Sequence, residues 1–168
     1  RGGGRGGAPP AASDIPAEYR DQLGRVSAEK TIPQLKQFLE SGGTIVAIGD
    51  SAANLIEHLG LPIDDHLVEN GKPLPRAKYF VPGSILGARV DTSQPIAAGM
   101  SERTNFFFDN SPVFKLRAEA GQAGVRPIAW FDSPTPLRSG WAWGQQYLDK
   151  GVVAIEARVG KGRVLLYG

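Results

Sequence analysis

Cysteine is absent from this sequence of 168 residues, and charge of neither sign is in large excess. Without a thiol, the chain cannot form a disulfide, a thiolate metal site or a cysteine nucleophile. Nineteen basic and 17 acidic side chains leave a net charge of +2, which gives no general electrostatic case for binding nucleic acid or a membrane surface. No apolar run approaches the ~18 residues that cross a bilayer. We therefore expect neither nucleic acid nor a membrane as a partner.

The chain divides into a short tail and one domain. Residues 1–14, "RGGGRGGAPPAASD", are low in complexity and predict a flexible loop or tail. Arginine–glycine repeats also occur in RNA-binding segments, but two arginines without an aromatic residue favour the plain loop. Residues 15–168 are numerous enough for a single domain with a core of its own. Because the sequence opens on Arg1 and stops in a strand-like pattern, we expect a fragment of a longer polypeptide, with part of the domain missing.

The first half of the domain has the pattern of a layered α/β protein. A helix is predicted from residue 31 to 39, before the stop signal Ser41-Gly42-Gly43. Thr44–Ile48 is short, apolar and β-branched, which is typical of a strand covered on both faces in a parallel sheet. After Gly49 the apolar residues recur at helical spacing and predict a helix that ends at Gly60. Helix, strand and helix in close order favour α/β layering.

The second half contains more turn signals and several short strands. Strands are expected near residues 85–90, at the aromatic run Phe106–Phe108 and near 126–133, with the three phenylalanines in the core. The last 18 residues predict a hairpin around the turn Gly160-Lys161-Gly162. Lys161 is expected to be a solvated turn residue, because the surrounding sequence lacks the pattern of a phosphate-binding loop.

Ser51 and Asp50 are the candidate catalytic residues. A serine at a strand-to-helix turn can project its hydroxyl above a sheet, next to helix amides that would hold an oxyanion. The run Gly49-Asp50-Ser51 also resembles the Gly-Asp-Ser block of a lipase and esterase superfamily, but the Asp-x-x-His block of that family is missing here. A serine nucleophile needs a base, and His58 and His66 are the only histidines. We favour a helix cap formed by Asp50 or Ser51, with a Ser51 nucleophile as the alternative.

Two further candidate sites are weaker. The stretch "EHLGLPIDDH" contains Glu57, His58, Asp64, Asp65 and His66, but its spacing matches neither common zinc motif. A structural role is favoured there, with the two aspartates in a solvated turn. The tryptophans in "SGWAWGQQYL", at positions 141 and 143, are expected to pack in a core or interface, with a ligand surface as the alternative.

Several segments taken together resemble a known family. They are "FLESGGTIVAIGDSAANLIEHLGLP", "PGSILGARVDTSQPIAAGM", "FFFDNSPVF", "SGWAWGQQYL" and "VVAIEARVGKGRVLLYG". In order and spacing they are similar to the C-terminal region of large bacterial zinc carboxypeptidase-like proteins of the carboxypeptidase A family. Those proteins carry a class I glutamine amidotransferase-like domain after the peptidase domain. The resemblance covers about residues 15–168.

The resemblance implies a flavodoxin-like, three-layer α/β domain with a mainly parallel sheet and the C-terminal hairpin. The amidotransferase cysteine would stand at the turn Gly49-Asp50-Ser51, so that cysteine-dependent chemistry is not expected in this chain. Gln94 stands where a histidine is common in such domains, which favours a structural turn. The zinc ligands of the peptidase, a His-x-x-Glu motif and a later histidine, have no match in this sequence.

We therefore expect a non-catalytic accessory domain with no metal or cofactor of its own. The resemblance implies that the peptidase activity and its zinc belong to an upstream domain of the same polypeptide, which would be the main partner. Self-association is left open, and the parent protein would be exported, to the periplasm or the medium. The alternatives are a hydrolase that uses Ser51 and a small-molecule or glycan-binding domain that uses Trp141, Trp143 and a pocket above Gly49.

Overall fold

The computed structural model describes residues 11–22 and 26–168. Most of the predicted tail, residues 1–10, lies outside this part. The described chain begins with two short 3-10 helices, η1 (Ala12–Asp14) and η2 (Ala17–Gln22). Within the described residues, no helix has the length and apolar character needed to span a membrane.

The helix–strand–helix segment is present where the sequence predicts it. Helix α1 (Thr31–Glu40) is followed by strand β1 (Thr44–Ile48) and helix α2 (Asp50–Leu59). Glycines end both helices: Gly42, with φ of 100°, donates its N–H to the carbonyl of Leu39, and Gly60 ends α2 in the left-handed conformation. Glycine tolerates this conformation, whereas a Cβ atom would strain it.

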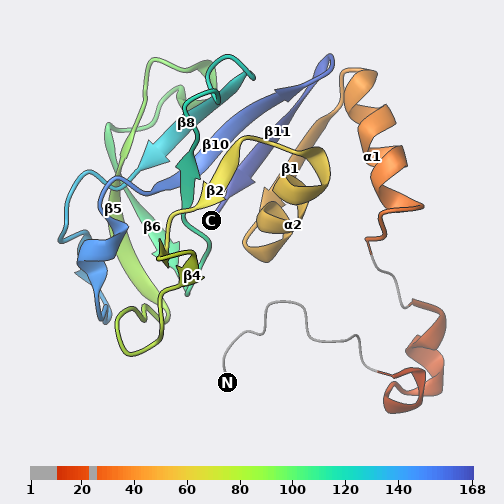
Figure 1. The fold of residues 1–168 in the computed structure, drawn as a ribbon, viewed down its shortest axis with the longest axis horizontal. Helices are drawn as coiled ribbons and strands as arrows, with labels where there is room; N and C mark the ends of the chain where they lie inside the picture. Colours follow the sequence, from red (N-terminus) through yellow and green to blue (C-terminus); the bar gives the residue numbers. More distant parts are fainter. Residues whose placement is uncertain (1–10, 23–25) are drawn as a thin grey trace.

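The rest of the described chain is built from short strands and turns (Figure 1). The strands are β2 (Ile63–Asp65), β3 (Val68–Glu69), β4 (Lys72–Pro73), β5 (Ser84–Val90), β6 (Arg103–Phe108), β7 (Phe114–Leu116), β8 (Val125–Trp130), β9 (Leu137–Ser139), β10 (Val152–Val159) and β11 (Gly162–Tyr167). Two more 3-10 helices are η3 (Pro95–Ala97) and η4 (Gln145–Leu148). Nine strands form one sheet whose main path runs β1-β11-β10-β8-β5-β6, and β3 and β4 form a separate ribbon.

The flavodoxin-like, mainly parallel α/β fold predicted from the sequence is wrong. Of the strand pairs in the described residues, β1 with β11 is parallel, and all the others are antiparallel. Parallel neighbours need a crossover connection of a dozen or more residues, usually a helix. After α2 the described chain has no further α-helix, so its strands are joined by turns and pair antiparallel. The protein is mostly β, with a mixed sheet and two α-helices.

Both helices lie at the β1 end of the sheet (Figure 1), where α1 contacts β1, β10 and β11, and α2 contacts β1. The expected C-terminal hairpin is present, with β10 and β11 in antiparallel register around Gly160 and Lys161. The start of β11 approaches α1 closely. A Cβ atom on Gly162 would lie 2.4 Å from the carbonyl oxygen of Gly43 and 2.5 Å from that of Leu39. Glycine at position 162 therefore allows the helix to rest directly on the strand.

Strand β1 is an edge strand, which contradicts the expectation that both of its faces are covered. Ala47 is buried beneath the helices, but Val46 is 56% exposed and Ile48 is 67% exposed. Successive side chains of a strand point to opposite faces of the sheet. One face of β1 is therefore packed, whereas the other presents branched apolar side chains to solvent.

The core consists of two clusters separated by the sheet. Alternation along β11 shows this, because Val164 and Leu166 belong to one cluster and Leu165 belongs to the other. The helix-side core includes Ile32, Leu39, Leu55, Ile56, Ile155, Val164 and Leu166. The far-side core includes Val81, Leu86, Phe108, Ile128, Phe131, Val153 and Leu165. The run of phenylalanines is divided by the same alternation, since Phe108 is buried and Phe107 is 69% exposed.

Candidate functional site

The turn after β1 carries both sequence-predicted catalytic residues, but it does not assemble a nucleophile. Gly49, with φ of 60° and ψ of −135°, occupies the N-cap of α2. Asp50 and Ser51 are the first residues of the helix and are exposed, so the prediction that one of them is the cap is wrong. Glycine is accepted at this position because it tolerates positive φ. The carboxylate of Asp50 is favourably placed in the first helical turn, near the positive end of the helix dipole.

His58 cannot serve as the base for Ser51. Both residues lie in α2, seven positions apart. A helix rises 1.5 Å per residue, so their backbone positions are separated by roughly 10 Å along the axis. Side chains that far apart on one helix do not form the hydrogen bond that activates a serine.

His66 has a structural role elsewhere. Its Nε2–H donates a hydrogen bond to the backbone carbonyl of Asp149, over 3.1 Å. Burial lowers the pKa of the His66 imidazole below its ordinary value, because the charged form loses hydration. The ring thus links the chain after β2 to the end of η4, and it is not available as the partner of Ser51.

Asp64 and Asp65, the acidic residues beside His66, also accept hydrogen bonds within the fold. Asp64 lies in β2, not in the solvated turn predicted from the sequence, and accepts hydrogen bonds from Nε and Nη2 of Arg117 at 2.9 and 2.7 Å. The Arg117 guanidinium lowers the pKa of the Asp64 carboxyl. Asp65 accepts the backbone N–H of Leu67. These two aspartates, with His66, Val68 and Lys115, line a pocket of about 380 Å³. Within the described residues, no three histidine or acidic side chains gather closely enough to hold a metal ion.

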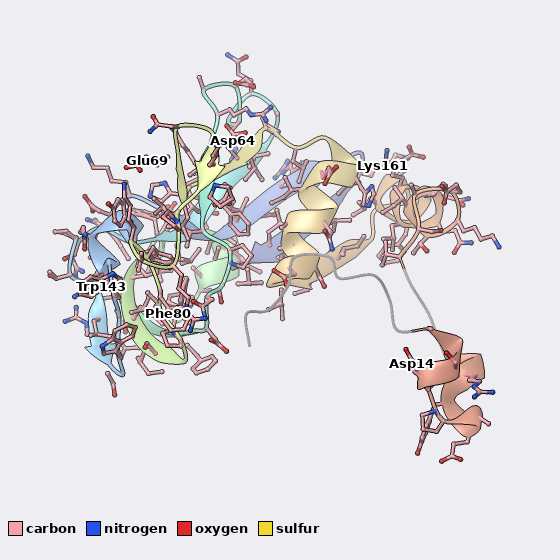
Figure 2. The ribbon with its side chains drawn as sticks, turned by 60° about the horizontal axis from the view of Figure 1, so that its bottom comes forward. Asp14, Asp64, Glu69, Phe80, Trp143 and Lys161 are labelled. Atoms are coloured by element: carbon pink, nitrogen blue, oxygen red, sulfur yellow. The ribbon has the colours of Figure 1, made fainter. Side chains whose placement is uncertain are left out.

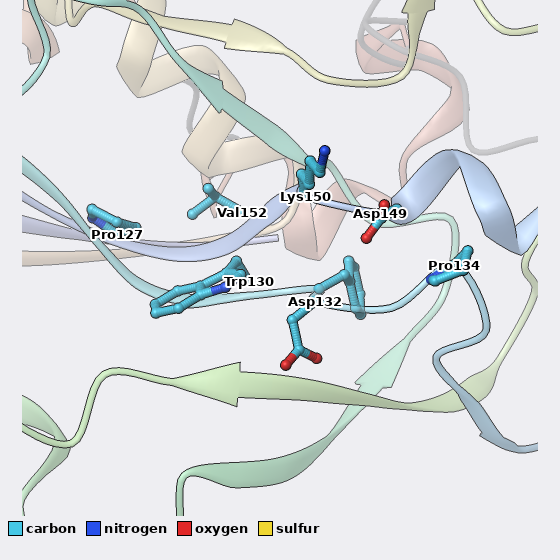
Figure 3. Close-up of a pocket in the computed structure, with 8 residues that line it drawn as sticks. Pro127, Trp130, Asp132, Pro134, Asp149, Lys150 and Val152 are labelled. Atoms are coloured by element: carbon cyan, nitrogen blue, oxygen red, sulfur yellow. The ribbon is translucent and has the colours of Figure 1, made fainter.

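A larger open pocket of about 530 Å³ lies between the end of β8 and the start of β10 (Figure 3). Its lining residues are Pro127, Trp130, Phe131, Asp132, Pro134, Asp149, Lys150 and Val152. The charged groups do not converge on one point. The Asp132 carboxylate points away from the Lys150 amine in Figure 3. It is held instead by both Nη atoms of Arg103, at 2.9 and 2.6 Å. Neither of these two pockets includes Gly49, so the predicted pocket above that turn is not among them.

The most distinctive exposed feature is an aromatic surface formed by Arg76, Phe80, Trp141 and Trp143. Trp141 is 53% exposed and Trp143 is 54% exposed, which contradicts packing in the core of this chain. Phe80 meets Trp141 edge to face, with ring centroids 5.9 Å apart, and the Arg76 guanidinium lies 3.8 Å from the centroid of Phe80. Figure 2 shows Phe80 and Trp143 at the same end of the molecule, away from Lys161 in the β10–β11 turn.

The backbone beneath the aromatic surface is fixed by several hydrogen bonds. Phe80 and Trp143 exchange both of their backbone hydrogen bonds, and the indole Nε1–H of Trp143 donates to the carbonyl of Ala77 at 2.7 Å. The buried hydroxyl of Ser84 donates to the carbonyl of Trp141 at 2.6 Å and accepts its N–H at 3.0 Å. The fold therefore fixes the backbone at both tryptophans and the indole ring of Trp143. Large aromatic side chains held in this way are enriched at binding surfaces.

Sequence reasoning identified the two tryptophans but missed their partners. Phe80 and Ser84 lie about 60 residues earlier in the chain, and no local pattern links them to Trp141. Gln94 was expected to hold a structural turn, and its side-chain amide donates to Asp91 at 2.8 Å and to the carbonyl of Pro127 at 2.7 Å. These contacts agree with a structural role for Gln94.

Comparison with known proteins gives a relationship at the level of the fold alone. No protein-family model matches this sequence, and no curated protein matches it significantly. Among solved structures, the fold is similar to part of the beta-galactosidase from Bacillus circulans sp. alkalophilus, with a TM-score of 0.50 and 10% sequence identity. The similarity covers 82% of this chain and 18% of the beta-galactosidase chain. At this identity the likeness carries no information on activity or substrate.

Proposed function

We propose that residues 15–168 form a non-catalytic accessory domain of a zinc metallocarboxypeptidase-like protein. The peptidase activity, and the zinc that supports it, would belong to an upstream domain of the same polypeptide. The attribution to this family rests on the order and spacing of the sequence segments that resemble it. The solved beta-galactosidase supports only one point, that a fold of this kind occurs as part of a larger enzyme chain. The matched part makes up 18% of that chain.

The observation that carries the non-catalytic part of the proposal is that neither histidine is placed to activate Ser51. Ser51 lies at the exposed start of α2, His58 lies two turns further along the same helix, and His66 bonds the carbonyl of Asp149. Activation of a serine needs a base within hydrogen-bond reach. This arrangement favours an accessory role over the Ser51 hydrolase.

Carboxypeptidase and esterase assays test the proposed function. We expect the protein from the complete reading frame to release C-terminal residues from peptides, and a chelator to abolish this activity. The 168-residue chain should show neither activity. Ser51→Ala should leave the carboxypeptidase and esterase activities unchanged, as should the control variant Ser101→Ala, which alters another exposed serine. Esterase activity of the chain that disappears with Ser51→Ala alone would establish the hydrolase instead. A complete reading frame without a peptidase domain would remove the family attribution.

The aromatic surface supports a second candidate function, the binding of a small molecule or glycan. Trp141 and Trp143 expose more than half of their surface, although the backbone around them is held by hydrogen bonds. Indole faces of this kind stack on the apolar face of a sugar ring or on another flat ligand, and a pre-positioned ring loses little conformational freedom on binding.

Tryptophan fluorescence tests this second candidate directly. If the surface binds glycans, a panel of soluble oligosaccharides should shift the emission of the wild-type chain, and Trp141→Ala should reduce the affinity about tenfold or more. Tyr19→Ala, which removes a 54% exposed aromatic ring elsewhere, is the matched control and should leave binding unchanged. An emission shift and an affinity that both stay at their wild-type values in Trp141→Ala and in Trp143→Ala would assign the shift to Trp130, the remaining tryptophan, and contradict binding at this surface.

A further inference from the structure

The free edge of β1 lacks the features that usually protect a sheet edge from pairing with a further strand. Among the described elements β1 pairs with β11 and with no other strand, so its opposite edge ends the sheet. Natural edge strands are usually protected by charged side chains, proline or a bulge. The sequence of β1, "TIVAI", has no charged residue and no proline, and its register with β11 is regular. At the other end of the main strand path, β6 begins with Arg103, which is paired with Asp132.

The backbone hydrogen bonds show which groups of β1 face outward. The carbonyl of Gly43 accepts the N–H of Arg163 at 3.1 Å, and the N–H of Gly49 donates to the carbonyl of Tyr167 at 2.8 Å. In a parallel pair, alternate residues direct both backbone groups toward the same neighbour. Residues 43, 45, 47 and 49 therefore face β11, and residues 44, 46 and 48 direct their N–H and C=O groups to the free edge. Among the described residues, these outward groups have no backbone partner.

The same residues carry the exposed apolar side chains. Thr44, Val46 and Ile48 combine outward backbone groups with side chains on the uncovered face, where Val46 is 56% and Ile48 is 67% exposed. A row of unpaired backbone donors and acceptors is matched by another extended strand. The apolar face next to that row favours β-branched or aromatic side chains at alternate positions of the incoming strand.

The length of β1 indicates where such a strand comes from. A stable complex between separate chains buries roughly 1,200–2,000 Å², and pairing along five residues falls short of that. A strand tethered to the same polypeptide by a short flexible linker needs much less contact area, because such a linker gives an effective concentration of about millimolar.

We propose that β1 is completed by an additional strand from a segment of the same polypeptide outside residues 1–168, with apolar side chains facing Val46 and Ile48. The inference rests on the proposed accessory role, and it identifies the surface through which the domain is joined to the rest of the protein. The added strand would satisfy the outward backbone groups of residues 44, 46 and 48 and cover the two exposed side chains.

Amide hydrogen exchange, measured on the 168-residue chain and on the protein from the complete reading frame, tests this inference. In the shorter chain, the amides of Thr44, Val46 and Ile48 should exchange quickly, whereas those of Ile45, Ala47 and Gly49 should be protected by β11. In the complete protein, the first three should exchange roughly 100-fold more slowly. Val46→Lys should reverse that protection without unfolding the shorter chain, and Met100→Lys, at a 41% exposed loop position, is the control.

Each other outcome overturns the inference. Equally fast exchange of the three amides in both proteins would show that no strand is added. Slow exchange that appears in the shorter chain only at high concentration, together with a dimeric mass, would identify a second copy as the occupant. The proposed function is judged separately by the peptidase assay. Protection without peptidase activity would remove only the family attribution, and activity without protection would remove only the added strand.

Discussion

Replacing Gly162 with alanine is expected to lower the free energy of unfolding by about 3 kcal/mol, the upper end of the usual cost of overpacking. The added Cβ would lie 2.4 Å from the carbonyl oxygen of Gly43, 2.5 Å from that of Leu39 and 2.9 Å from the Leu39 Cα. All three are backbone atoms, so no side-chain rotation can relieve the contact. The C-terminal end of α1 would have to move away from β11, and the helix-side core would open with it.

Urea denaturation followed by circular dichroism measures this effect. Gly121→Ala is a matched control, because a Cβ at that position meets nothing within 4 Å. Its stability should stay within about 0.5 kcal/mol of the wild-type value. Equal midpoints for the two variants would mean that α1 does not rest on β11 in solution.

Truncation of Phe131 to alanine is expected to cost about 4 kcal/mol of stability. Phe131 is 0% exposed in the far-side core and meets Phe108 edge to face, with centroids 6.1 Å apart. The substitution removes the apolar transfer free energy of the ring and leaves a cavity that the surrounding strands fill only in part. Domains of this size are stable by roughly 5–15 kcal/mol, so the variant loses a large share of that margin.

The exposed ring of Phe107 provides the comparison for Phe131. It is 69% exposed, and its truncation to alanine should change stability by no more than about 0.5 kcal/mol. Because Phe131→Ala is expected to leave little stability, Phe131→Leu should be measured beside it, and its loss should be smaller. Similar losses for Phe107→Ala and Phe131→Ala would mean that the two faces of the sheet are wrongly assigned.

Local structure could be predicted from this sequence where local patterns determine it. The helical spacing of apolar residues in α1 and α2, with glycine after each helix, gives both elements close to their observed bounds. The hairpin of β10 and β11 follows from two apolar runs around Gly160. In these segments, the residues that set the structure lie within a few positions of one another.

The topology could not be predicted in the same way. The apolar run of β1 is typical of a strand covered on both faces in a parallel sheet, and that interpretation, together with the family resemblance, led to the prediction of a mainly parallel fold. In the structure Val46 and Ile48 are exposed at a sheet edge, and the sequence of a strand does not reveal how many neighbours it has. The contacts at the candidate sites could not be predicted from local sequence patterns either. The His66–Asp149 hydrogen bond joins residues 83 positions apart, and only the folded chain brings them together.

The pairing of β1 with β11 also determines when the sheet can close. Thr44 and Arg163 are partners in that pair and lie 119 residues apart, near opposite ends of the described chain. Ribosomes extend a chain by about 5–20 residues per second, so β1 waits on the order of 10 s for its partner to be made. Throughout that interval, "TIVAI" is an uncharged, β-branched segment of the kind that aggregates between nascent chains. Synthesis from the N-terminus therefore makes α1 well before β11, the strand on which it rests, and we expect the yield of folded protein to depend on protecting the five residues of β1 until β11 has been made.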